Sequence, residues 1–110
     1  MMNVLSASRE GRLTVYLGGE LDQHEARELS ACVSELMDEF LPRDCVLDLG
    51  ALSFMDSSGI AVIVKAARHM KSIGGRLWVD NPGKQVRRVI DAAGLDRMIP
   101  VLSGRVGGLT

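Results

Sequence analysis

Hydrophobic and polar positions alternate with a period of two near the start of the chain. The odd positions from Leu13 to Leu17 are aliphatic and the even ones are not, which is the pattern of a half-buried strand. Residues 4–8 form a weaker strand candidate, and the Glu10-Gly11 pair between the two segments offers a tight turn. We therefore expect two adjacent strands that pair antiparallel.

A helical period begins after the glycine pair at 18–19. Apolar residues recur there at steps of three and four up to Phe40, which indicates an amphipathic helix. Asp22 precedes this helix as its N-cap, and Glu25 stands three residues further on as the capping-box partner. Pro42 ends the helix.

Helices and short apolar segments alternate over the rest of the chain. Residues 45–49, 77–79 and 98–102 are expected to be strands. A second helix is expected from Ser57 to about Ser72, and a third opens at Asn81-Pro82, with the proline near its first turn, and ends at Gly94. Helices between strands need right-handed crossovers, which make neighbouring strands parallel. The pattern predicts an α/β fold with a mixed four- to five-stranded sheet and helices packed mainly on one face.

Length and composition fit a single domain over residues 1–110, of which the glycine-rich tail 103–110 is expected to fray. Thirteen basic and fourteen acidic side chains leave a formal net charge of −1, and only 4% of residues are aromatic, so neither charge nor stacking favours nucleic acid. No apolar run approaches the ~20 residues of a membrane span. Cys32 and Cys45 lack CxxC spacing and are expected to be reduced core thiols. These features predict a cytoplasmic protein with no membrane partner.

The strongest local candidate for chemistry is Asp56-Ser57-Ser58-Gly59, which stands at a helix start after a strand and a loop. A helix N-terminus carries unpaired N–H groups and a partial positive charge, so it suits a phosphate group. The simpler interpretation is an N-cap at Asp56 or Ser57 and a packing glycine at Gly59. The residue types alone favour that simpler interpretation.

Enzymatic interpretations have little support. The serine region is not a G-x-S-x-G elbow, and no Walker loop or dinucleotide motif occurs. His24 and His69 are expected to be solvated surface residues. Lys84, Arg87 and Arg88 are expected to form a solvated helix face, with a phosphate contact as the alternative. We therefore expect no catalytic residues, no metal and no cofactor.

Three motifs together resemble those of the STAS-domain anti-sigma factor antagonists, and the sporulation-type antagonists are the best match. The motifs are Gly19-Glu20-Leu21-Asp22, the stretch Leu-Ser-Phe-Met-Asp-Ser-Ser-Gly-Ile at 52–60, and Ala93-Gly94-Leu95. The resemblance extends from Leu13 to Val101 and implies the STAS fold.

The resemblance also implies a mechanism. In that family the unphosphorylated antagonist binds an anti-sigma factor that is also a serine kinase, and this binding releases the sigma factor. The kinase phosphorylates the first serine of the motif, which matches Ser57, and a metal-dependent serine/threonine phosphatase restores the antagonist. ATP and Mg²⁺ would belong to the kinase. The implied partner-binding residues are Asp22, Asp56, Ser57, Ser58, Gly59 and Ile60.

Two other functions remain open. A STAS scaffold or a transporter-associated regulatory subunit could use the same surface without phosphorylation, and an enzyme would need turnover of nucleotide by the chain alone. A contact role for the second helix has a simple sequence basis. Residues 60–64 are all apolar, and one sheet cannot cover every side of a helix, so we expect Ile60 and Val64 to stay partly exposed.

Overall fold

The computed structural model describes residues 2–102, and strands and helices follow one another in the order that the sequence predicts. The strands are β1 (Met2–Arg9), β2 (Arg12–Leu21), β3 (Asp44–Met55), β4 (Arg76–Asp80) and β5 (Val101–Leu102). The helices are α1 (Gln23–Phe40), α2 (Ser57–Ser72) and α3 (Lys84–Ala93), followed by the short 3₁₀ helix η1 (Leu95–Arg97). The tail that is expected to fray, residues 103–110, lies outside the described residues.

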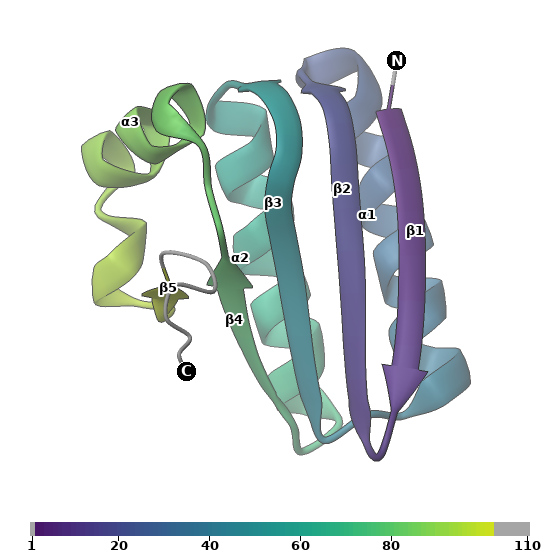
Figure 1. The fold of residues 1–110 in the computed structure, drawn as a ribbon. Helices are drawn as coiled ribbons and strands as arrows, with labels where there is room; N and C mark the ends of the chain where they lie inside the picture. Colours follow the sequence, from purple (N-terminus) through teal and green to yellow (C-terminus); the bar gives the residue numbers. More distant parts are fainter. Residues whose placement is uncertain (1, 103–110) are drawn as a thin grey trace.

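The five strands form one mixed sheet in the order β1-β2-β3-β4-β5. β1 and β2 pair antiparallel, as predicted, whereas the other neighbours are parallel. Glu10 and Gly11 connect the first pair with positive φ angles of 52° and 82°, which suit the twist of a two-residue hairpin. Figure 1 shows α1 and α2 side by side behind the sheet, with α3 beside the upper end of β3. The predicted α/β class is confirmed.

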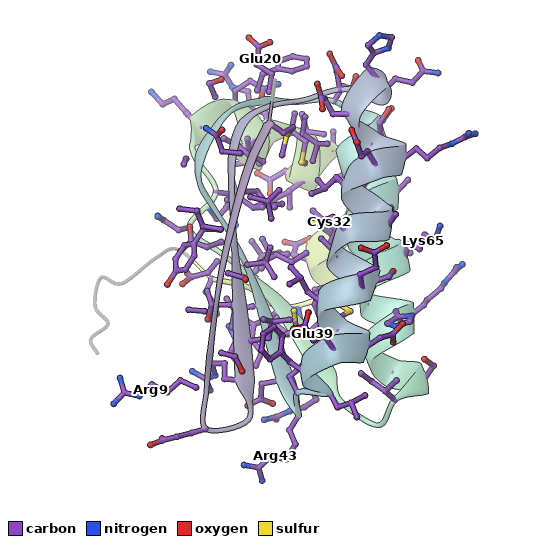
Figure 2. The ribbon with its side chains drawn as sticks, turned by 90° about the vertical axis from the view of Figure 1, so that its right-hand side faces the viewer. Arg9, Glu20, Cys32, Glu39, Arg43 and Lys65 are labelled. Carbon is purple, nitrogen blue, oxygen red and sulfur yellow. The ribbon has the colours of Figure 1, made fainter. Side chains whose placement is uncertain are left out.

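The hydrophobic core lies between one face of the sheet and the helices α1 and α2. The alternating residues Leu13, Val15 and Leu17 of β2 are fully buried, and the helices contribute buried residues at helical spacing. These helix residues are Leu29, Val33, Met37, Val62, Ile63, Ala66 and Met70. Figure 2 shows the layer of side chains between sheet and helices in profile. Burial of each large aliphatic side chain contributes roughly 1.5–3 kcal/mol, so this layer fixes both helices on the sheet.

Two strands, β2 and β3, extend at least four residues beyond the C-terminal ends that the sequence pattern indicates. β2 continues through Gly18 and Gly19 to Leu21, although the alternation stops at Leu17. β3 runs to Met55, where a loop was expected after residue 49. The cause is mutual pairing, because the parallel ladder between β2 and β3 extends to the pair Leu21 and Met55, with two register shifts on the way. Residues 50–55 are therefore held in the sheet rather than in a loop.

The C-terminal third shows two smaller differences from the expected elements. The last strand is Val101–Leu102 rather than 98–102, because the chain first forms η1, and the N–H of Met98 donates to the carbonyl of Leu95. α3 begins at Lys84 with Gly83 as its N-cap, so Pro82 precedes the helix instead of lying in its first turn.

None of the helices between residues 2 and 102 is long and apolar enough to cross a membrane.

Both cysteines are free, but only one lies in the core. Cys45 is fully buried in β3, and this burial raises the pKa of its thiol to about 12. Cys32 on α1 is only partly buried, so the expectation of two core thiols is wrong for this residue. Its side chain lies at the edge of a surface cavity between α1 and β1.

Candidate functional site

The candidate site lies where β2 and β3 end side by side. Leu21 and Met55 are register partners in the parallel ladder, and the N–H of Asp56 donates to the carbonyl oxygen of Leu21 at 3.2 Å. Each strand is followed by one aspartate and then by a helix. Asp22 and Asp56, which are far apart in the sequence, therefore occupy equivalent positions on neighbouring strands. Two helix N-termini meet at this edge of the sheet.

Both aspartates cap the helix that follows them. Asp22 Oδ1 accepts hydrogen bonds from the backbone N–H groups of His24 at 3.0 Å and Glu25 at 3.2 Å. Asp56 Oδ1 accepts from the N–H of Ser58 at 2.8 Å. The predicted N-cap at Asp22 is confirmed, and of the two candidates for α2 the structure selects Asp56. Each carboxylate is partly buried at the positive end of a helix dipole, which stabilises its negative charge.

The two serines at the start of α2 have different surroundings. Ser57 is the first residue of the helix and is exposed, and among the described residues its hydroxyl has no hydrogen-bond partner. Ser58 is partly buried and lines a groove of about 360 Å³ between α1 and α2, to which Arg27 and Lys65 also contribute. Among the described residues neither hydroxyl has a hydrogen-bond partner, so the two serines differ in exposure, and Ser57 is the more exposed one.

Gly59 allows the first turn of α2 to sit directly on the strand ends. It is buried, and a Cβ at this position would run into the side chain of Met55 and lie 3.1 Å from Cδ2 of Leu21. Any larger residue would have to push α2 away from β2 and β3. The glycine therefore allows the first turn of α2 to pack closely on the ends of β2 and β3.

The start of α2 leaves apolar surface uncovered, as the sequence predicts. Ile60 and Val64 are partly exposed, whereas Val62 and Ile63 between them are buried in the core. Phe54 at the end of β3 adds a large side chain that is 39% exposed. Phe54 belongs to the motif at residues 52–60, but no pattern in the sequence distinguishes it as a surface residue.

Gln85 is a site residue that sequence reasoning missed. It is the second residue of α3, and its side-chain amide bonds both backbone groups of Met55. The N–H of Met55 donates to Gln85 Oε1 at 2.9 Å, and Gln85 Nε2 donates to the carbonyl oxygen of Met55 at 2.9 Å. The partners are 30 residues apart, so no local pattern could reveal this contact.

The other candidate residues lie away from this arrangement or have structural roles. His24 is exposed, as expected, whereas His69 Nε2 lies 2.7 Å from Asp38 Oδ1 and links α2 to α1. The basic residues of α3 border a cavity of about 400 Å³, and Arg87 lies 3.5 Å from Asp91. Within residues 2–102 no cluster of three or more histidines, cysteines, aspartates or glutamates could hold a metal ion.

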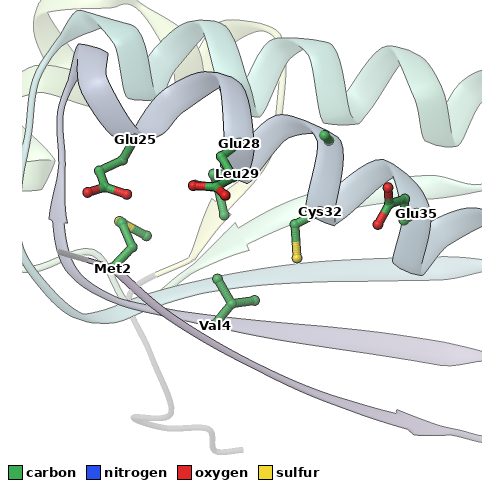
Figure 3. A pocket seen from close by; sticks show the side chains of 8 residues that line it. Met2, Val4, Glu25, Glu28, Leu29, Cys32 and Glu35 are labelled. Atoms are coloured by element: carbon green, nitrogen blue, oxygen red, sulfur yellow. The ribbon is translucent and has the colours of Figure 1, made fainter.

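A separate cavity of about 480 Å³ lies between β1 and the outer side of α1. Figure 3 shows Met2 and Val4 on one side of it and Glu25, Cys32 and Glu35 on the other. None of the predicted partner-binding residues lines it. The cavity is therefore not part of the candidate site.

Comparisons with known proteins agree with this architecture. Residues 3–106 match the STAS domain family. An anti-sigma F factor antagonist of Paenibacillus polymyxa is 34% identical over 100 residues, which cover 91% of this chain and 86% of the relative. The anti-sigma-B factor antagonist of Bacillus subtilis (strain 168) is 29% identical over 109 residues, with coverage of 98% and 97%. The solved structure of the anti-sigma factor antagonist SpoIIAA in its unphosphorylated form matches with a TM-score of 0.76 and 27% identity, over 100% of this chain and 99% of that one. This chain belongs to the STAS-domain family and, within it, to the anti-sigma factor antagonists.

Proposed function

We propose that this chain binds an anti-sigma factor through the ends of β2 and β3 and the start of α2, and that phosphorylation of Ser57 ends the binding. The proposed contact residues are Asp22, Asp56, Ser57, Ser58, Gly59 and Ile60. The observation that carries the proposal is the exposed Ser57 hydroxyl, which stands at a helix N-terminus beside two capping aspartates and has no partner among the described residues. The chain is an antagonist of the partner-switching type and is regulated by phosphorylation.

The charge of a phosphate explains how one modification can break the complex. A phosphate on Ser57 adds about −1.5 to −2 charges at pH 7. The positive end of the α2 dipole accommodates this charge, so the fold persists. A partner surface fitted to a neutral hydroxyl instead meets bulk and negative charge next to Asp56 and Asp22. A loss of only ~3 kcal/mol would weaken binding by more than a hundredfold.

The proposed partners follow from this cycle. The anti-sigma factor acts as the serine kinase and brings ATP and Mg²⁺, and a serine/threonine phosphatase removes the phosphate. Anti-sigma factor antagonists are themselves non-enzymatic regulators, so the chain is the substrate in both reactions. Because the partner controls transcription, we place the cycle in the cytoplasm. The similarity to an anti-sigma F antagonist supports a role in sporulation. The similarity to an anti-sigma-B antagonist is the basis for the alternative, a role in the general stress response.

The decisive experiment maps the phosphate. The purified chain is incubated with its cognate anti-sigma kinase, ATP and Mg²⁺. The tryptic peptide 44–65, which contains Ser57 and Ser58, is then fragmented in a mass spectrometer to locate the phosphate. We expect one phosphate on Ser57 in the wild type and in the matched control Ser58→Ala, and none in Ser57→Ala. Modification of Ser58 with Ser57 intact would contradict the proposal. Tight binding without any phosphate would instead favour the scaffold alternative.

A further inference from the structure

The last part of β3 lacks a strand neighbour on one side. β4 pairs with β3 only from Asp44 to Asp48, because β4 ends at Asp80. From Gly50 to Met55, the described residues pair with β3 only through β2. α3 packs against β3 on the other side, but a helix cannot continue a ladder with its own backbone. The backbone groups of Met55 on that side therefore need a partner of another kind.

The side chain of Gln85 takes the place of the missing strand at Met55. Its amide accepts from the N–H and donates to the C=O of this one residue, both at 2.9 Å. A residue of a neighbouring strand could make the same pair of bonds. Among side chains in their usual ionisation states at neutral pH, only the carboxamides carry a donor and an acceptor in this fixed arrangement, and asparagine is one methylene shorter. We call this contact the Gln85–Met55 bridge.

The bridge restrains the segment from which Ser57 projects. Met55 is tied to α3 by the bridge, and the next residue, Asp56, is tied to β2 through the carbonyl of Leu21. Asp56 also bonds the N–H of Ser58 and accepts at its carbonyl from the N–H of Gly59. Ser57 lies between these fixed points. Removal of the bridge would leave residues 55–57 attached to β2 but no longer to α3.

We infer that Gln85 is a positioning residue for the phosphoryl acceptor: it holds Met55, and through Met55 and Asp56 it fixes where the Ser57 hydroxyl stands when the kinase binds. The inference rests on the proposed function of Ser57. Its physical basis is that transfer to a hydroxyl requires the acceptor oxygen within a narrow range of positions, and a displacement near 1 Å can lower the rate by about a hundredfold. Gln85 itself touches backbone and takes no part in the chemistry.

The first test replaces the amide by a side chain of similar length that cannot bond. In Gln85→Met we expect the Met55 amide to exchange its hydrogen at least roughly tenfold faster in NMR experiments, because it loses its acceptor. We expect kcat for phosphorylation of Ser57 by the anti-sigma kinase with ATP and Mg²⁺ to fall by roughly tenfold, with KM for the chain little changed. Gln23→Met, the same change at the exposed first residue of α1, is the matched control for exchange at Met55. A variant that is merely less stable but still folded would keep the wild-type kcat.

The second test separates hydrogen bonding from packing. In Gln85→Glu the ionised side chain can still accept from the Met55 N–H, but it has no donor for the Met55 carbonyl, whereas its protonated form has one. We therefore expect the ¹³C signal of the Met55 carbonyl to move toward its wild-type position as the pH falls through the titration of the new carboxyl. The wild type should show no such transition.

The outcomes distinguish this inference from the proposed function. If both Gln85 variants are phosphorylated with wild-type kcat, or if the Met55 amide exchanges at its wild-type rate in Gln85→Met, the inference is overturned while the role of Ser57 stands. If the wild type itself receives no phosphate on Ser57, the proposed function fails, and the inference fails with it.

Discussion

Among the single residues of the site, Asp22 combines a structural contact with a charge at the proposed binding surface. Its carboxylate caps α1 through two backbone N–H groups and is still partly exposed. The cap needs only an oxygen acceptor, whereas an electrostatic contact with the anti-sigma factor would need the negative charge. One conservative substitution can separate the two roles.

We predict that Asp22→Asn weakens binding of the anti-sigma factor without unfolding the chain. Asparagine caps helices about as well as aspartate, so the free energy of unfolding should stay within roughly 0.5 kcal/mol of the wild type. Affinity measured by calorimetric titration should fall roughly tenfold, which corresponds to about 1.4 kcal/mol. The control Asp22→Ala also removes the cap and should cost ~1 kcal/mol of stability. Unchanged affinity in Asp22→Asn would reduce Asp22 to a structural residue.

The two thiols should differ in reactivity, since Cys45 is fully buried and Cys32 is not. Burial raises the pKa of Cys45 from 9.0 to about 12, so at pH 8 the folded chain presents this thiol protonated and shielded. We expect one thiol to react with DTNB in the native protein, two in urea, and none in native Cys32→Ser. Fast labelling of native Cys32→Ser would contradict the assignment.

The same shift predicts how stability depends on pH. The unfolded thiol ionises near pH 9 and the folded one near 12, so the unfolded state binds fewer protons between these values. The contribution of Cys45 to stability is therefore complete below pH 9 and is lost as the pH rises toward about 12.

Among the three α-helices, α3 is the one that lacks a side-chain N-cap. Its N-cap, Gly83, offers no side chain to the free N–H groups, although φ of −74° and ψ of −178° suit any residue and no atom would lie within 4 Å of a Cβ there. Because α3 carries Gln85, the stability of this helix bears on the Gln85–Met55 bridge.

We predict that Gly83→Asp stabilises the chain by about 0.5–1 kcal/mol. The new carboxylate would cap α3 and lie at its positive end, close to Lys84. Urea denaturation measures the change. The matched control is Gly94→Ala at the other end of α3, where φ of +66° requires left-handed backbone, and this variant should lose ~1 kcal/mol. A destabilising Gly83→Asp would show that the start of α3 is restrained by contacts other than its cap.

The sequence predicts an element well where the residues that determine its bounds lie within or next to that element. α2 runs from Ser57 to Ser72 as predicted, because a capping aspartate, an apolar face and a glycine pair define it without reference to the rest of the chain. The ends of β2 and β3 could not be predicted in this way, since each extends only because the other lies beside it. Gln85 lies beyond any local argument, because its partner is a backbone 30 residues away. Residue types also could not choose between Ser57 and Ser58; that choice came from the resemblance.

For the molecule as a whole, the proposed phosphorylation site at Ser57 lies outside the core, although Gly59 of the same motif packs directly on it. The site residues lie at the ends of β2 and β3, whereas the buried layer that stabilises the fold lies along the length of α1 and α2. Because the Ser57 side chain is exposed, a change of charge there would act on the proposed interface without disturbing the packing of the core.

We predict that Ser57→Asp folds normally and binds the anti-sigma factor at least a hundredfold more weakly. The negative charge interacts favourably with the N-terminus of α2 by roughly 0.3–1 kcal/mol, which offsets repulsion from Asp56, so the unfolding free energy should stay within about 1 kcal/mol of the wild type. The control Ser57→Asn has nearly the same shape without the charge and should bind far better. Equal losses of binding in both variants would indicate that size, not charge, ends the complex.

The arrangement around Ser57 also determines which molecules the proposed kinase can detect. The acceptor is framed by the end of β2, by the junction of β3 and α2, and by Gln85 of α3, and these segments meet only in the finished fold. A nascent, misfolded or proteolysed chain carries the same serine but not the same surface. Such a chain would neither sequester the anti-sigma factor nor consume ATP. Release of the sigma factor would therefore depend on the concentration of correctly folded protein and not on the total amount of chain. Damaged chains would not contribute to it, and no separate step would be needed to remove them.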